Sequence, residues 1–150
     1  TRISPEHPVI TSKFIGDGIE TEVDGVSDRE PVIVVPVEHI EPPNVHSGDS
    51  TMVIPPRGLD YKLNDEWRLK MAEASLRIAR ALNIVGPFNI QFIARDRLYV
   101  IEANVRSSRS MPFTSKATGV NLMNLSVKAT LGGLSMDREF MVLRCLKRPC

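Results

Sequence analysis

The chain has 150 residues, of which 42% are hydrophobic and 25% are charged, and its formal net charge is +1. This balance argues against a nucleic-acid surface, and no apolar run reaches the roughly 18 residues that a membrane-spanning helix needs. The chain has two cysteines near its end, no secretory signal and no initiator methionine, so we expect part of a longer cytoplasmic protein with reduced thiols.

The first predicted elements are two short strands. Pro8–Ile15 and Ile19–Gly25 flank a Gly-Asp-Gly turn at 16–18, which predicts a hairpin. Three acidic residues alternate along the second strand and so share one face: Glu20, Glu22 and Asp24. That pattern favours a solvated edge strand, and it leaves room for one of the three carboxylates to point into a site.

A nearly continuous apolar run, Pro31–Ile40, predicts a buried strand. Pro36 cannot donate a backbone hydrogen bond to a neighbouring strand, so we expect an edge or a bulge there. The loop that follows, Glu41–Ser50, is rich in small polar residues whose backbone N–H groups can hold an anion. His46 in this loop is a candidate contact for a phosphate or a ribose, and an ordinary surface loop with a hydrogen-bonding histidine is the simpler alternative.

One strong amphipathic helix is predicted after Asn64, which is a good N-cap and precedes two acidic residues. Its apolar stripe indicates core packing and comprises Trp67, Met71, Ala74, Ile78, Ala81 and Leu82. Further on, a short helix is predicted near Ser115–Ala117, closed by Gly119, and another at Leu122–Leu131, stopped by a Gly-Gly pair. Phe140–Leu146 has the composition of a final strand.

The region from 88 to 104 predicts a hairpin of Phe88–Arg95 and Leu98–Asn104. A two-residue loop, Asp96-Arg97, places Gln91 directly opposite Glu102. This loop lacks the glycine or asparagine that tight hairpins favour. A loop of three residues would break the pairing of Gln91 with Glu102, whereas a loop of four would keep it.

The two faces of this hairpin differ in character. One face is predicted to be core and carries Phe88, Ile90, Phe92, Ala94, Tyr99, Ile101 and Ala103. The other gathers Gln91, Glu102 and Asn104, and Arg106 and Arg109 follow just beyond. Oxygen ligands suit Mg²⁺, and arginine binds phosphate through a planar fork. These residues therefore indicate a site for a metal, a nucleotide and an anion, and a plain solvated face is the alternative.

The order of strands, helix, strands and helices indicates an α+β fold with a mostly antiparallel sheet packed with helices. Beyond this pattern, several motifs resemble the large subunit of carbamoyl-phosphate synthase, from about Pro8 to Gly132. They are SPEHPVITSKFI, EVDGV, EHIEPPNVHSGDS, GPFNIQFIA and VIEANVRSSRSMPFTSKATGVNL. An E-x-N-x-R strand is shared by other ATP-grasp ligases, whereas HSGDS with SRSxPFxSKATGV is more specific and looks like the C-terminal of the two synthetase halves.

The resemblance implies that residues 1–133 form the C-terminal lobe of an ATP-grasp domain, with 134–150 as a tail. It implies ATP, Mg²⁺ or Mn²⁺, and K⁺ as a further ion. Metal ligands would be Gln91, Glu102 and Asn104, and Arg106 and Arg109 would bind phosphate and carbamate. Nucleotide contacts would include Lys13, Ile15, Glu20, Asn44, Val45, His46 and Ser47, together with Gln91 and Glu102. Asn44 departs from the family's usual glycine.

By the same resemblance, this half phosphorylates carbamate, which derives from bicarbonate, to carbamoyl phosphate. Several parts of such an enzyme are absent from this chain: the N-terminal ATP-grasp lobe, the other synthetase half and the glutaminase small subunit. We therefore expect the isolated chain to bind nucleotide weakly or not at all. Two alternatives remain, namely a non-catalytic remnant that serves for docking or nucleotide binding, and another ATP-grasp carboxylate ligase.

Overall fold

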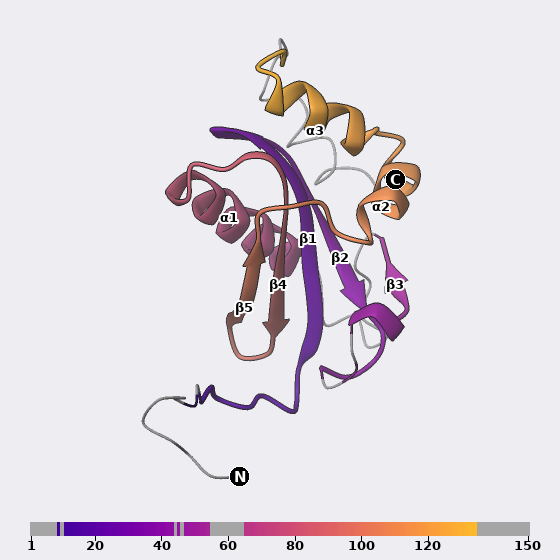
Figure 1. The fold of residues 1–150 in the computed structure, drawn as a ribbon. Helices are drawn as coiled ribbons and strands as arrows, with labels where there is room; N and C mark the ends of the chain where they lie inside the picture. The colour runs from indigo at the N-terminus through magenta and orange to yellow at the C-terminus, as the bar shows by residue number, and fades with distance from the viewer. Residues whose placement is uncertain (1–8, 10, 44, 46, 55–64, 135–150) are drawn as a thin grey trace.

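The computed structural model describes residues 9, 11–43, 45, 47–54 and 65–134. These residues form a five-stranded antiparallel sheet in the order β3-β2-β1-β4-β5, with three α-helices around it (Figure 1). The strands are β1 (Ile19–Asp28), β2 (Glu30–His39), β3 (Met52–Val53), β4 (Val85–Ala94) and β5 (Leu98–Asn104). The helices are α1 (Asp65–Ala81), α2 (Met111–Thr118) and α3 (Leu122–Thr130). The predicted α+β class with an antiparallel sheet is therefore confirmed.

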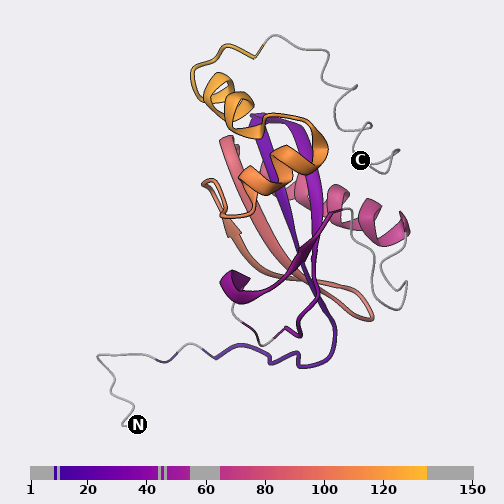
Figure 2. The same cartoon turned by 90° about the vertical axis from the view of Figure 1, so that its right-hand side faces the viewer.

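Helices cover the two faces of the sheet unequally (Figure 2). Helix α1 packs on one face, where Met71 and Ala79 join a core with Val23, Phe88 and Phe92. Helices α2 and α3 pack over one end of the opposite face, and there Met111, Leu122 and Leu125 bury Val26 and Ile33. The rest of that second face is left for polar side chains. None of the described helices is both long and apolar enough to span a membrane.

Strand β1 lies at the centre of the sheet, paired with β2 on one side and with β4 on the other. Residues 11–15 form no strand, so the predicted hairpin around 16–18 is wrong. The expectation of a solvated edge is also wrong, because Glu20, Glu22 and Asp24 are only 6%, 3% and 0% exposed. Alternation identifies residues that share a face, but it does not show what covers them. Here His39 on β2 lies beside Glu20 and Glu22, and the side chains around Asp24 come from segments more than 60 residues later in the chain.

In the hairpin of β4 and β5, Gln91 lies opposite Glu102 as predicted, but the loop length and the register differ from the prediction. Ala94 pairs with Leu98, so the loop has three residues, and a shift in register between Gln91 and Phe92 restores the expected partner. Ile101 is the extra residue of this bulge. The bulge moves Tyr99 to the face of Ile93, so its predicted core position is wrong, and Leu98 packs against the core instead.

Helix α1 begins at Asp65, and its predicted cap, Asn64, lies outside the described residues. The buried side chains of this helix are Met71, Ala72, Ser75 and Ala79. The buried face of the helix therefore differs in part from the predicted apolar stripe. Ala74 and Ile78 are only partly buried, and Leu82 is 55% exposed. The helix is followed by a tight turn in which Asn83 adopts a positive φ of 49°.

Two positions in the sheet depend on their residue type. A Cβ on Gly25 would lie 2.2 Å from the ring of Phe88, its partner on β4, so only glycine lets this buried ring cross β1. Pro36 lies where β2 has a strand partner on one side only, because β3 pairs with Glu38 and His39 alone. This position agrees with the edge that proline predicted.

The two later helices end close to their predicted ends, but α2 (Met111–Thr118) begins four residues before the predicted Ser115. Helix α2 ends at Gly119, which has the left-handed φ of 69° typical of a C-cap, and α3 is capped by Asn121, whose side chain accepts a hydrogen bond from the Asn124 backbone. The predicted strand at Phe140–Leu146 lies outside the described residues.

Candidate functional site

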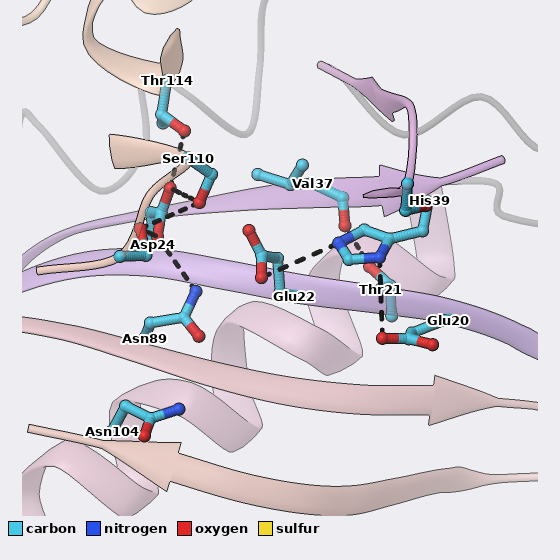
Figure 3. A network of polar contacts seen from close by, with 12 residues as sticks. Glu20, Thr21, Glu22, Asp24, Val37, His39, Asn89, Asn104, Ser110 and Thr114 are labelled. Carbon is cyan, nitrogen blue, oxygen red and sulfur yellow. Dashed lines mark hydrogen bonds and ion pairs between the residues drawn. The ribbon is translucent and has the colours of Figure 1, made fainter. Parts of the chain in front are cut away.

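Two rows of polar side chains cross β1, β4 and β5 on the same face of the sheet. In one row, Glu22 pairs with Gln91 and Gln91 with Glu102. In the next row, Asp24 pairs with Asn89 and Asn89 with Asn104 (Figure 3). Because side chains two apart on a strand share a face, all six residues lie together. The structure thus brings together the predicted Gln91, Glu102 and Asn104, and β1 adds two carboxylates to them.

Hydrogen bonds link polar side chains at the end of β5 and just after it. Asn104 Nδ2 donates to Glu102 Oε1 at 2.8 Å, and Arg106 Nη2 donates to Asn104 Oδ1 at 3.4 Å. Arg106 also donates to the backbone oxygen of Ser107 at 3.1 Å. Glu102 and Arg106 are exposed, so a ligand has direct access to both charges.

A cavity of about 380 Å³ opens on this face. It is lined by four of the predicted site residues, Gln91, Glu102, Arg106 and Arg109, and by Glu22, Asn89, Met52, Ser108 and Ser110. Its lining combines two arginines with two carboxylates, which suits a ligand that carries both metal and phosphate.

A second cavity of about 330 Å³ shares Arg109, Ser110 and Met52 with the first. Gly48 and Phe113 also line it. A Cβ on Gly48 would lie 2.2 Å from Arg109 Nη1, so the guanidinium rests against the backbone of the 3₁₀ turn η1 (Ser47–Asp49). The predicted anion-binding loop is therefore next to Arg109, which separates the two cavities.

The loop is held by Glu41, at the end of β2. Its Oε2 accepts hydrogen bonds from Ser50 Oγ at 2.7 Å and from the Thr51 backbone N–H at 2.6 Å, and its Oε1 accepts from Thr51 Oγ1 at 2.8 Å. These bonds lower the pKa of Glu41 to about 2. The carboxylate therefore stays ionised and keeps the loop beside the site.

A buried histidine lies between two buried glutamates at one end of the polar face (Figure 3). His39 Nδ1 is 3.6 Å from Glu20 Oε1, and His39 Nε2 is 3.7 Å from Glu22 Oε2. These distances exceed those of hydrogen bonds, and the contacts are ion pairs when His39 is protonated. Burial opposes charge on His39, but Glu22 and Glu20 outweigh it and raise the pKa of His39. Burial likewise opposes charge on Glu22, and His39 and the neighbouring polar side chains outweigh it and lower the pKa of Glu22.

These two shifts predict how stability depends on pH. The contribution of His39 is full below its ordinary pKa of 6.5 and is lost as the pH rises through its raised folded value. The contribution of Glu22 is full above 4.5 and is lost as the pH falls through its lowered folded value. We therefore expect this pair to contribute most between those two values.

Urea unfolding of this chain and of His39→Gln between about pH 6 and pH 9 measures the effect. The free energy of unfolding should fall with rising pH in the unmodified chain and should be flatter in the variant. Thr21→Val, a buried change on the other face of β1, serves as the control and should keep the original slope. Equal slopes in the unmodified chain and His39→Gln would show that His39 is not protonated in the folded state.

Asp24 is fully buried and accepts four hydrogen bonds (Figure 3). Asn89 Nδ2 and Ser108 Oγ donate to Oδ1, and Ser110 Oγ and Thr114 Oγ1 donate to Oδ2, each of the last two at 2.7 Å. Burial raises the pKa of Asp24, the Ser108 hydrogen bond opposes that shift and the charge of Glu22 adds to it. The carboxyl group joins β1 and β4 to the segment that precedes α2.

The remaining predicted residues are only partly assembled. Glu20 contacts His39 but lines neither cavity, and Val45 is partly buried near the η1 turn. Lys13 is exposed with its ammonium 5.7 Å from the centre of the Tyr99 ring, and Ile15 lies in the segment before β1. Ser47 begins the η1 turn. Asn44 and His46 lie outside the described residues.

The oxygen atoms of this face could serve as metal ligands. Among the described residues, no three His, Cys, Asp or Glu side chains gather in a group that could hold a metal. The predicted ligands are instead one carboxylate, Glu102, and two amides. An all-oxygen set of this kind fits Mg²⁺, which takes few protein ligands and completes its shell with water and phosphate oxygens.

Sequence reasoning missed the roles of His39, Asn89, Ser108 and Ser110 in this face. Asn89 lies two residues before Gln91 on the same strand, so period-two alternation was enough to place it. His39 ends an apolar run, and the preceding strand carries alternating acidic residues. This pattern was a second signal, which could have indicated that His39 contacts those acids. The serines are placed by a loop, for which the sequence carries no comparable periodicity.

Comparison with known proteins gives a family match over most of the chain. The family described as "Carbamoyl-phosphate synthase L chain, ATP binding domain" matches residues 2–136. The carbamoyl phosphate synthase large chain of Pyrobaculum aerophilum is 52% identical over 145 residues, which cover 95% of this chain and 14% of that protein. Those of Saccharolobus solfataricus and Pyrococcus furiosus are 51% and 52% identical and are covered to 13% and 12% of their lengths. The chain therefore spans a small part of the relatives that it matches.

Two solved structures have the same fold. A biotin carboxylase complex from Campylobacter jejuni superposes with a TM-score of 0.67 at 17% identity, covering 85% of this chain and 28% of that one. A single-chain, multi-domain long-chain acyl-CoA carboxylase also gives 0.67, at 19% identity, covering 87% of this chain and 13% of that one. Identities this low support the fold alone.

Proposed function

Because this chain belongs to the family of the carbamoyl-phosphate synthase L chain ATP-binding domain, we propose that it supplies one wall of a site for ATP-dependent phosphorylation of carbamate. The observation that carries this proposal is the cavity in which Gln91 and Glu102 lie beside Arg106 and Arg109. The carboxylate suits a metal–phosphate ligand, and the arginines suit an anionic acceptor.

The chemistry requires two anions to approach each other. The acceptor is a carbamate and the donor is the γ-phosphoryl group of ATP, so their repulsion must be offset. We propose that Gln91, Glu102 and Asn104 hold Mg²⁺ or Mn²⁺, which would neutralise charge on the phosphate oxygens. Arg106 and Arg109 would bind the phosphate and the carbamate through their guanidinium forks. No side-chain nucleophile is needed for such a transfer.

The nucleotide would lie along the sheet from these ligands toward the segment before β1. In this proposal Lys13, Ile15 and Glu20 contact the adenosine, and the loop of Asn44, Val45, His46 and Ser47 contacts the nucleotide from the other side. Support comes from the η1 turn, which lies against Arg109 at the edge of the cavity.

We further propose that the segment comes from the C-terminal synthetase half, since it carries HSGDS and the PFTSKATG sequence after Arg109. The product would then be carbamoyl phosphate. The chain covers 14% of the Pyrobaculum relative, so the N-terminal ATP-grasp lobe, the other half and a glutaminase subunit would be supplied by the rest of the enzyme.

The test is formation of ATP from ADP and carbamoyl phosphate, which is the proposed reaction in reverse. This chain is assayed alone and after complementation with a segment that carries the missing N-terminal lobe, hereafter the complemented protein. We expect activity only in the complemented protein, and only with Mg²⁺ or Mn²⁺ present. Absence of ATP formation under both conditions would contradict the ligase proposal and favour a non-catalytic docking or nucleotide-binding module.

A further inference from the structure

We propose that Asp24 is a positioning residue, which fixes Arg109 and the segment between β5 and α2 in the geometry that phosphoryl transfer needs. This inference rests on the proposed function of Arg109. Asp24 lines neither of the two cavities that Arg109 borders, so it would act through its neighbours and not through contact with a ligand.

The first argument is the placement of Arg109 between two anchored serines. Ser108 and Ser110, its neighbours on either side, both donate side-chain hydrogen bonds to Asp24. Their hydroxyl oxygens lie 2.8 Å apart, and Ser108 Oγ also accepts the Met111 backbone N–H at 3.0 Å. The backbone at Arg109 is therefore held on both sides by one carboxyl group.

The second argument is that the anchor is rigid. Asp24 lies on β1, which is paired on both sides, and it is fully buried. Thr114 on α2 and Asn89 on β4 donate the other two hydrogen bonds. Asn89 is in turn the strand partner of Asn104, one of the proposed metal ligands. One carboxyl group thus connects the segment that carries Arg109 to the strand β4, which pairs with the proposed metal ligands of β5.

The third argument concerns the residue type. A carboxylate has two oxygens that accept several hydrogen bonds, and here each oxygen accepts two. Asparagine keeps one such oxygen, so half of the contacts would have to rearrange. Alanine would remove the shared acceptor of three hydroxyls and one amide, and only the Ser108 and Ser110 hydroxyls could then bond to each other.

The most direct test measures the order of Arg109 in this chain without any ligand. The Nε–Hε resonance of Arg109, assigned by its absence in Arg109→Lys, reports side-chain motion through its heteronuclear NOE. We expect an ordered signal in the unmodified chain, a mobile one in Asp24→Ala and an intermediate one in Asp24→Asn. Because no ligand is used, this result does not depend on whether the chain is a ligase.

The second readout is turnover of the complemented protein. We expect Asp24→Ala to lower kcat for ATP formation by about 10²-fold with the KM for ADP nearly unchanged, because misplacement of a reacting group costs rate and not nucleotide binding. Partial recovery in Asp24→Asn is expected. Thr21→Val, which alters a buried hydroxyl on the other face of β1, is the matched control and should leave kcat unchanged.

If Asp24→Ala does not fold, Ser110→Ala takes its place, because it removes one anchor beside Arg109 and keeps the carboxylate. An ordered Arg109 signal with unchanged kcat in a folded variant would overturn the positioning role. If Arg109 is mobile in Asp24→Ala and the unmodified complemented protein forms no ATP, the positioning role is supported and the proposed function is contradicted.

Discussion

Replacing Glu102 by glutamine is expected to lower ATP formation by the complemented protein by at least about 10²-fold, with the fold intact. Glu102 is the only carboxylate among the three proposed metal ligands, so the change removes all of their formal charge. Glutamine keeps the size of the side chain, and its amide oxygen can still accept the hydrogen bond that Asn104 donates to Glu102. The loss should therefore fall on metal and phosphate binding rather than on folding.

The measurement is kcat as a function of Mg²⁺ concentration, together with thermal unfolding. The Mg²⁺ concentration at half-maximal rate should rise in Glu102→Gln, and Tm should change little. Glu73→Gln, the same change at an exposed position on α1, is the matched control and should have no effect. Turnover equal to that of the unmodified protein would rule out the metal role of Glu102.

The second large effect is expected from Arg109→Ala, which should reduce kcat by about 10³-fold, the scale at which an arginine that stabilises transferring phosphoryl charge contributes. Arg109 borders both cavities, so its loss would remove the positive charge from the place where donor and acceptor would meet. Arg109→Lys keeps a charge but not the planar fork, and we expect it to recover only a small part of the rate.

Here the KM for ADP distinguishes a role in transfer from a role in nucleotide binding. We expect that KM to stay within a few-fold in Arg109→Ala, while the KM for carbamoyl phosphate rises. Arg80→Ala removes an arginine whose Nε forms an exposed ion pair with Glu30 at 2.8 Å, and it should leave both values unchanged. A loss confined to ADP binding would assign Arg109 to the nucleotide and not to the acceptor.

Periodicity was sufficient to predict part of this site. Glu102 and Asn104 share a face because they are two apart on a strand, and the opposition of Gln91 to Glu102 was predicted from a hairpin with a two-residue loop. The predicted two-residue loop was wrong, yet the pairing is present because the bulge at Ile101 compensates for the third loop residue. Local sequence determines the hairpin, but loop length and bulge position offset each other in ways that alternation does not reveal.

The carboxylates of β1 show where such reasoning ends. Alternating acids look the same on a solvated edge strand and on a buried polar face. What separates the two cases is the set of tertiary contacts on this face. His39 lies beside Glu20 and Glu22, and the four donors to Asp24 are 65 to 90 residues later in the chain. Burial of this kind depends on tertiary contacts, and a pattern confined to one strand carries no information about them.

The distance along the chain between Asp24 and its donors also has a consequence for synthesis on the ribosome. Strands β1 and β2 are neighbours in sequence and can pair as soon as both have emerged. The carboxyl group of Asp24 must then stay hydrated until Thr114 has been added, because none of its four hydrogen-bond donors precedes residue 89. We therefore expect the contacts of the polar face to form last. On a ribosome stalled before residue 114, the nascent chain would have paired β1 and β2 but would lack the complete proposed ligand site.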